Sequence, residues 1–242
     1  MRDTSFLDWP FFDDSHRTLA AELRVWAERA IAPIASAEPR GAELDRTCVR
    51  LVRLLGEAGW LRRAVTKPFG GIAERLDVRS LCLIRETLAS YSGLADFVFA
   101  LQGLGAGPIT MFGSEDLRRR YLPRVASGEA IPAFAISESK AGSDVGAMLT
   151  TARRDGDCYI IDGEKTWISN AGIAAFYVVF CRLADAAERK FVALVVDAAT
   201  PGLAVSARSE ILAPHPICTI SFNGCPVPAT AVLGLPGKGM SV

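Results

Sequence analysis

The hydrophobic period of this chain changes near residue 130, and no other feature constrains its fold as much. Before that point apolar residues recur at helical spacing, as in Leu19, Leu23 and Trp26. After it the apolar segments are short, alternating and rich in β-branched residues. These segments are 131–137, 149–154, 158–165, 176–183, 191–197, 203–207 and 217–222. We therefore expect an α+β protein with a helical domain over residues 1–129 and a β domain over residues 130–242.

Local signals place several elements within these two parts. Residues 78–100 are mostly apolar and predict one long central helix, and Ser114 is a candidate N-cap for a helix over 115–127 that stops at Gly128. Asp155-Gly-Asp157 predicts a hairpin between two strands. Because short strands follow one another with no helical segment between them, we expect an antiparallel barrel or sandwich, of which we choose the barrel, rather than a doubly wound sheet.

The charge balance argues against polyanionic partners. Lys and Arg together number 27, as do Asp and Glu, so the formal net charge is zero. We expect neither nucleic acid nor an anionic membrane surface as a partner. Six cysteines without a Cys-x-x-Cys pair, and only two histidines, also argue against a zinc site.

Two apolar regions bear on targeting. Residues 94–112 include Asp96, Gln102 and Pro108, which favours a buried helix followed by a turn over a membrane span. The first 14 residues carry four aspartates, which is untypical of a signal or transit peptide. We expect a cytoplasmic protein with reduced thiols.

Two short segments carry the chemistry. Residues 134–144 begin as a strand and break into a loop where Gly142 frees the backbone and three serines offer hydrogen-bond donors. Residues 165–170 end a hairpin with Trp167 between Thr166 and Ser169. A flat redox ring needs an aromatic face to exclude water and donors aimed at the atoms whose charge grows on reduction. The two segments together predict a flavin site.

The order of these motifs resembles that of the acyl-CoA dehydrogenase family. The matching residues are Glu138, Ala141-Gly-Ser-Asp144, Trp167-Ile-Ser-Asn170, Pro201-Gly202 and Val227-Pro228, with Glu57-Ala-Gly-Trp60, Phe69-Gly-Gly71 and Phe112-Gly-Ser-Glu115 in the helical half. The similarity covers nearly the whole chain. It departs from the common pattern at Ser139-Lys140, where the family frequently has proline. The last residues, from Gly237, resemble the point where the family enters its C-terminal helical bundle, so we expect a chain that lacks this bundle.

The resemblance implies FAD as cofactor and assigns roles to individual residues. Ser137 would face the pyrimidine edge of the flavin and Ser169 would lie near its N5 atom. Trp167 would shield the ring, and Ser143 would lie where the FAD pyrophosphate and a bound acyl-CoA approach each other. The cofactor-binding residues implied in this way are Phe134, Ile136, Ser137, Ser143, Trp167, Ile168 and Ser169, with Ser143 also contacting substrate.

The implied activity is removal of two hydrogens from an acyl-CoA thioester to give a 2-enoyl-CoA. The family passes the electrons to an electron-transfer flavoprotein, and its base is in most members a glutamate on the C-terminal bundle. We therefore assign no catalytic residue here and expect a homo- or hetero-oligomer with a chain that supplies the bundle. His215 could act as a base near neutral pH, but a structural loop residue is the favoured interpretation. The alternatives are an acyl-CoA oxidase or flavin monooxygenase on the same fold, and a non-catalytic remnant that acts through protein contacts.

Overall fold

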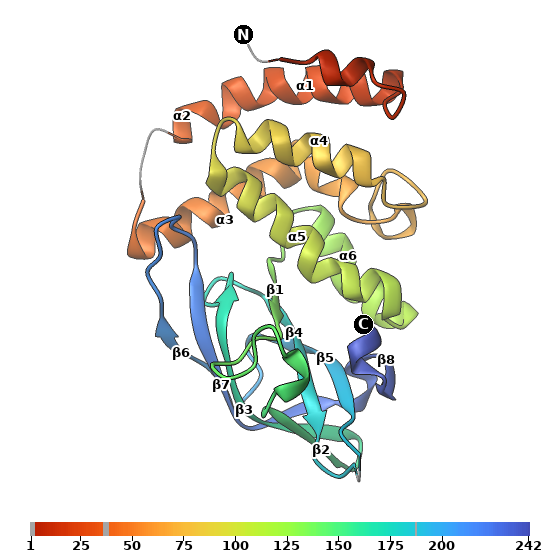
Figure 1. Ribbon diagram of the computed structural model, residues 1–242, viewed down its shortest axis with the longest axis vertical. Coiled ribbons are helices and arrows are strands. Elements are labelled where there is room, and N and C mark those ends of the chain that lie inside the picture. The colour runs from red at the N-terminus through yellow and green to blue at the C-terminus, as the bar shows by residue number, and fades with distance from the viewer. Residues whose placement is uncertain (1–2, 36–38, 187) are drawn as a thin grey trace.

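The computed structural model describes residues 3–35, 39–186 and 188–242. Helices form one end of the molecule and strands the other (Figure 1). The helices are α1 (Asp14–Ala30), α2 (Ala32–Ala35), α3 (Gly41–Glu57), α4 (Val78–Ala89), α5 (Gly93–Phe112) and α6 (Glu115–Ala126). Short 3-10 turns lie at Ser5–Asp8, Trp60–Arg63, Lys67–Phe69, Val145–Ala147, Ala229–Ala231 and Gly239–Ser241. The expected α+β organisation, helical first and β second, is therefore confirmed.

The helix ends follow the capping residues. The Ser114 side chain accepts a hydrogen bond from the Leu117 amide at the start of α6, as predicted, and Gly128 adopts a positive φ of 76° just after its end. The single helix expected over 78–100 is wrong. Ser92 caps a separate helix by accepting from the Ala95 amide, so the chain turns between α4 and α5.

Helix α5 is the one described helix that is long and apolar enough to span a membrane by length and composition. It continues through Pro108 to Phe112, beyond the turn expected from the sequence. In the fold it packs against α3, α4, α6 and β1, which accounts for its apolar composition.

The strands are β1 (Pro132–Ala135), β2 (Thr151–Asp155), β3 (Cys158–Ser169), β4 (Phe176–Leu183), β5 (Phe191–Asp197), β6 (Leu203–Arg208), β7 (Ile217–Pro228) and β8 (Val232–Gly237). They form one sheet in the order β6-β7-β3-β2-β4-β5-β8, with β1 also paired to β4. The expected antiparallel barrel requires correction because the sheet is mixed: β1 and β2 both run parallel to β4. Strand β3 runs antiparallel to β2, and the chain reverses again after Ser169. Strand β4 therefore runs parallel to β2 and to β1.

Strands β1 and β2 share one edge of β4, and this division creates the site. Ala135 pairs with Val179, and Thr151 pairs with Arg182 further along the same strand. The 15 residues between these strands, 136–150, leave the edge as a loop. The first predicted flavin segment therefore starts in β1 and continues into the loop that leaves the side of β4 between β1 and β2.

Strand β4 is buried on both faces. Phe176, Val178 and Phe180 pack in the core that the sheet shares with α5 and α6, while Tyr177 and Val179 point into the core inside the β domain. A near-continuous apolar run suits a strand that is covered on both sides. The helical part has its own core, which includes Leu23, Leu51 and Leu88.

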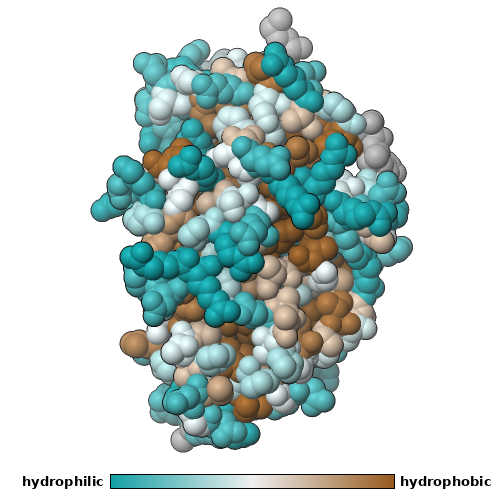
Figure 2. Space-filling view, turned by 180° about the vertical axis from the view of Figure 1, so that it is seen from behind, coloured by the Kyte–Doolittle hydropathy of each residue, from teal (hydrophilic) through white to brown (hydrophobic). Residues whose placement is uncertain are grey.

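Large hydrophobic side chains also reach the surface in both parts. Seen from behind, apolar residues are exposed among polar ones near the middle of the molecule (Figure 2). The side chains of Leu104, Met111, Leu149, Trp167 and Leu212 are among those at least half exposed. Scattered exposed apolar residues are common in globular proteins, so only those beside a built site bear on function.

Candidate functional site

The two predicted flavin segments meet in space. The Thr166 amide on β3 donates a hydrogen bond of 3.0 Å to the Ser137 carbonyl in the loop after β1. This bond places Ser137 beside Thr166, the neighbour of Trp167. The Ser137 and Ser143 hydroxyls take part in none of the hydrogen bonds among the described residues, so both are available to a ligand.

A bulge in β3 turns Trp167 outward. The register with β7 shifts between Lys165 and Ile168, so that both of these side chains point inward. Trp167 lies between them with a φ of 55°, and its indole is 55% exposed. A positive φ at a bulky residue costs free energy and is typical of functional sites. The backbone thus holds a large aromatic surface toward solvent beside Ser169.

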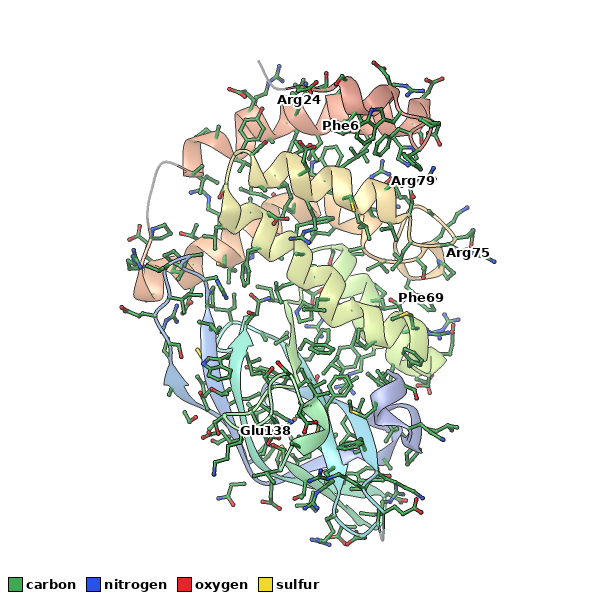
Figure 3. All side chains as sticks on the ribbon, in the orientation of Figure 1. Phe6, Arg24, Phe69, Arg75, Arg79 and Glu138 are labelled. Atoms are coloured by element: carbon green, nitrogen blue, oxygen red, sulfur yellow. The ribbon has the colours of Figure 1, made fainter. Side chains whose placement is uncertain are left out.

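A buried ion pair anchors the loop beneath this surface. Lys165 is fully buried, and its Nζ lies 2.8 Å from Glu138 Oε1. The same ammonium donates to the Ile136 carbonyl at 3.0 Å and lies 3.8 Å from Met148 Sδ. Glu138 is in the loop that follows β1, inside the β domain (Figure 3). One cation from β3 therefore contacts both ends of the 136–150 loop.

The Glu138 carboxylate completes the anchor. It accepts the Leu149 amide at 2.6 Å and the Thr150 amide at 3.0 Å. Burial alone would raise the pKa of Glu138, but the hydrogen bonds from Lys165, Thr150 and Leu149 outweigh it and lower the pKa below its ordinary value. Glu138 is therefore ionised and fully engaged near neutral pH, which makes it unsuitable as a catalytic base.

Gly163 lets the end of the loop lie against β3. The Thr150 hydroxyl donates to the Glu164 carbonyl at 3.0 Å. A Cβ on Gly163 would lie 2.7 Å from the Thr150 Cα, and the glycine has a φ of 137°. Only glycine suits that conformation and that approach.

The other predicted cofactor residues divide into buried and exposed groups. The Phe134 ring lies 5.0 Å from the Phe180 ring, and Ile136 packs in the same core against the helices. Ile168 is buried inside the β domain. Contacts from these three to a surface ligand would come mainly from their backbone. Ser143 is exposed, as is Lys140, at the outer part of the loop.

Ser169 and Asn170 join the second segment to the rest of the site. Asn170 has a φ of 64°, donates from Nδ2 to the Pro132 carbonyl at 3.0 Å and is buried with no partner for Oδ1 among the described residues. Ser169 Oγ lies 3.4 Å from His215 Nε2. The structure therefore brings Ser137, Trp167 and Ser169 to one region, with Ser143 further along the loop.

A cavity of about 490 Å³ opens beyond His215. Most of its lining is apolar and comes from the end of α2, the first turns of α3 and α5, and the segment before β7; it includes Ile34, Leu44, Leu51, Leu94, Phe97, Leu212 and Pro214. Its polar lining residues are Arg40, Thr47, Tyr91, Ser92 and His215. An apolar cavity with few polar groups is typical of a small-molecule site.

The residues present fit a flavin. The exposed indole offers a flat apolar face, and the uncommitted Ser137 hydroxyl and the Ser169 hydroxyl offer polar contacts beside it. Among the described residues no group of three or more His, Cys, Asp or Glu side chains is placed to hold a metal ion. The arrangement therefore suits binding and polarising an organic ring.

Sequence reasoning included Lys165 in the second predicted flavin segment but assigned it no role, although a signal was present. Strand alternation puts position 165 on the same face as Tyr159 and Ile161, which are buried. A lysine on an inward face requires a partner, and Glu138 in the other motif is the nearby carboxylate that meets this need.

Two family models match the chain. The model described as "Acyl-CoA dehydrogenase, N-terminal domain" matches residues 13–129, and the one described as "Acyl-CoA dehydrogenase, middle domain" matches residues 133–225. The human mitochondrial short-chain specific acyl-CoA dehydrogenase is 31% identical over 236 residues, which are 95% of this chain and 55% of the human protein.

Solved structures show the same similarity. An acyl-CoA dehydrogenase from Bacillus anthracis complexed with FAD has a TM-score of 0.84 at 29% identity, over 95% of this chain and 39% of that one. A chain in the structure of the electron transferring flavoprotein of Acidaminococcus fermentans has a TM-score of 0.87 at 28% identity, over 95% of this chain and 60% of that one. The chain thus spans between two fifths and three fifths of the length of these three proteins.

Proposed function

Because this chain belongs to the acyl-CoA dehydrogenase family, we propose that it binds FAD and takes part in the α,β-dehydrogenation of an acyl-CoA thioester to a 2-enoyl-CoA. The observation that carries this proposal is the meeting of Ser137, Trp167 and Ser169 on one surface, anchored from beneath by Glu138 and Lys165. The FAD complex of the relative from Bacillus anthracis supports the choice of cofactor.

Each residue of this surface has a task in the proposal. Trp167 would cover one side of the flavin and exclude water, and Ser137 would donate to the ring atoms on which negative charge grows. Ser143 would contact the pyrophosphate of FAD and the substrate. Phe134, Ile136 and Ile168 would contribute backbone groups and apolar support. The bound flavin would supply the acceptor for the β-hydrogen, which leaves as hydride.

The cavity beside His215 would hold the acyl part of the substrate. It adjoins Ser169 through His215, so an apolar chain in it would end near the flavin surface. Its volume is within the usual range for a small-molecule pocket. Its mostly apolar lining suits the hydrocarbon part of an acyl group.

The α-proton must leave to a base, and we place that base outside the described residues. The one buried carboxylate at the site, Glu138, is held by Lys165 and two amides. Asp144 is exposed at the outer part of the loop. A helical segment or partner chain that covers the flavin surface would supply the base, and an oligomer would bring it into place.

The electrons would pass to an electron-transfer flavoprotein, in a cytoplasmic setting. Support for this partner comes from the chain of similar fold in the electron transferring flavoprotein structure from Acidaminococcus fermentans.

The proposal can be tested with purified protein, FAD, acyl-CoA esters of increasing chain length and an artificial electron acceptor. We expect 2-enoyl-CoA, detected by mass spectrometry, once a base-bearing segment is supplied by co-expression. Product that forms only with oxygen consumption would assign an oxidase instead. No product with any ester, and no bound flavin, would refute the proposal.

A further inference from the structure

His215 lies between the cavity and the proposed flavin surface, and its two ring nitrogens have different partners. Nδ1 lies 3.0 Å from the Ala213 carbonyl, and Nε2 lies 3.4 Å from Ser169 Oγ. A carbonyl oxygen can only accept, so Nδ1 carries the proton of the neutral ring. Nε2 then has a free lone pair, and the Ser169 hydroxyl is the donor to it.

The ring is held in this orientation by its surroundings. It stacks on Phe97 with ring centroids 4.2 Å apart and an angle of 33° between the planes. Two prolines flank it, and the Asn170 amide donates to the Pro216 carbonyl at 2.8 Å. This bond ties the His215 segment to the residue next to Ser169, so the imidazole and the hydroxyl keep their relative positions.

Loss of solvent around the His215 ring favours its neutral form. Burial lowers the pKa of His215 below its ordinary value, although the hydrogen bond to Ala213 acts in the opposite direction. Arg40, Arg208 and Glu210 line a second, small groove that His215 also lines. Arg208 pairs with Asp45 of α3, and Asp96 of α5 pairs with Arg85. Cys218 of β7 donates its thiol proton to the Ala171 carbonyl.

We propose that His215 is a positioning residue that fixes the hydroxyl of Ser169 at the flavin edge by accepting a hydrogen bond from it at Nε2. This inference rests on the proposed function, because the ligand that Ser169 would contact is the proposed flavin. Because the Ser169 hydroxyl donates its hydrogen bond to His215, Ser169 presents an oxygen lone pair to that ligand. A hydrogen-bond acceptor at this position favours a flavin nitrogen that carries a proton over one that is unprotonated. Protonation of His215 at low pH reverses the bond, since Nε2 then donates and frees the Ser169 proton.

The contact can be tested without flavin by histidine NMR, because the chain has only two histidines. Long-range ¹H–¹⁵N spectra should show neutral His215 with its proton on Nδ1. In Ser169→Ala the titration midpoint of His215 should rise, because a bond to the neutral form is lost. His16, which contacts Asp13 and Asp77 instead, is the internal control and should not move. A proton on Nε2, or an unchanged midpoint in S169A, would overturn the inference.

Flavin binding gives a second readout that separates this inference from the proposed function. His215→Phe keeps a ring against Phe97 but removes the acceptor, and we expect FAD affinity to fall about two- to tenfold, the size of one neutral hydrogen bond. His215→Gln retains an acceptor oxygen and should restore most of the affinity without a pH-dependent flavin spectrum.

Equal affinity and equal pH dependence in wild type and H215F would refute a positioning role. If wild-type protein binds no FAD, the proposed function fails and the role toward flavin fails with it, while the NMR result still decides whether the Ser169–His215 bond exists.

Discussion

Lys165 Nζ and Glu138 Oε1 lie 2.8 Å apart, with both side chains buried beneath the loop that joins β1 to β2. Each group contacts parts of the chain that the other does not. Lys165 reaches the Ile136 carbonyl, and Glu138 reaches the amides of Leu149 and Thr150. The pair therefore connects the end of β1, the start of β2 and the middle of β3, and it fixes the loop that carries the predicted cofactor residues Ser137 and Ser143.

Removing one partner of this pair should be costly. Lys165→Met leaves the Glu138 carboxylate buried without its cation, and Glu138→Gln leaves the ammonium without its anion. We expect either change to lower the free energy of unfolding by about 3 to 5 kcal/mol, measured by urea denaturation. The double variant Glu138→Leu with Lys165→Met should recover part of that loss. Lys140→Met at an exposed lysine is the control, and an equal effect there would contradict the anchoring role.

The Glu138 carboxylate should also make stability depend on pH. Its pKa in the folded protein is below the ordinary value of 4.5, so as the pH falls the unfolded chain binds a proton before the folded one does. The contribution of Glu138 is fully present above pH 4.5 and is lost as the pH falls through its folded pKa. Thermal unfolding should show a weaker acid dependence in Glu138→Gln, whereas Glu164→Gln at an exposed position should keep the wild-type slope. Identical slopes in all three proteins would refute this assignment.

Gly163→Ala should disturb the loop more than a substitution at another glycine of positive φ. At Gly163 the new Cβ meets the Thr150 Cα at 2.7 Å, in addition to the strain of its φ, which costs about 1 to 3 kcal/mol. Gly156 has a φ of 55° and nothing within 4 Å of an added Cβ, so Gly156→Ala tests a positive φ without a close approach. We expect G163A to be the less stable variant by chemical denaturation, and equal stabilities would show that the close approach is unimportant.

Trp167→Ala with Ser169→Ala should weaken FAD retention with little loss of stability, because the indole is more than half exposed. Base–aromatic stacking of comparable rings contributes about 1 to 3 kcal/mol, so affinity should fall about five- to 150-fold. Trp9→Ala removes an indole that is 57% exposed in the helical part and serves as the control. Fluorescence titration of FAD measures both, and unchanged affinity in the double variant would remove these residues from the site.

Much of the fold could be predicted because its signals are local. The strands at Phe176–Leu183 and Phe191–Asp197 have the predicted bounds, and the hairpin at Gly156 and Asp157 forms as expected. The break between α4 and α5 was missed because the apolar pattern continues across Ser92, whose capping bond decides the boundary. The parallel pairing of β1 and β2 with β4 depends on contacts between distant segments, which local patterns do not encode.

The site was predicted only in part, because some of its features are local in the sequence and others depend on distant segments. Motif order pointed to Ser137, Trp167 and Ser169 as residues of one site, and their roles toward FAD stay predictions. The bulge that exposes Trp167 and the bond between Ser169 and His215 arise from strand register and from a loop 46 residues away. Neither can be deduced from residue spacing, because each depends on how separate strands are aligned.

The most direct test of the account is the visible absorption spectrum of the purified chain after addition of FAD and removal of free cofactor by gel filtration. The account predicts that flavin elutes with the protein and that its absorption bands are shifted from those of free FAD, because the Trp167 surface excludes water from the ring. Flavin that elutes entirely free of the protein, also after co-expression with a helical segment that covers this surface, would contradict it.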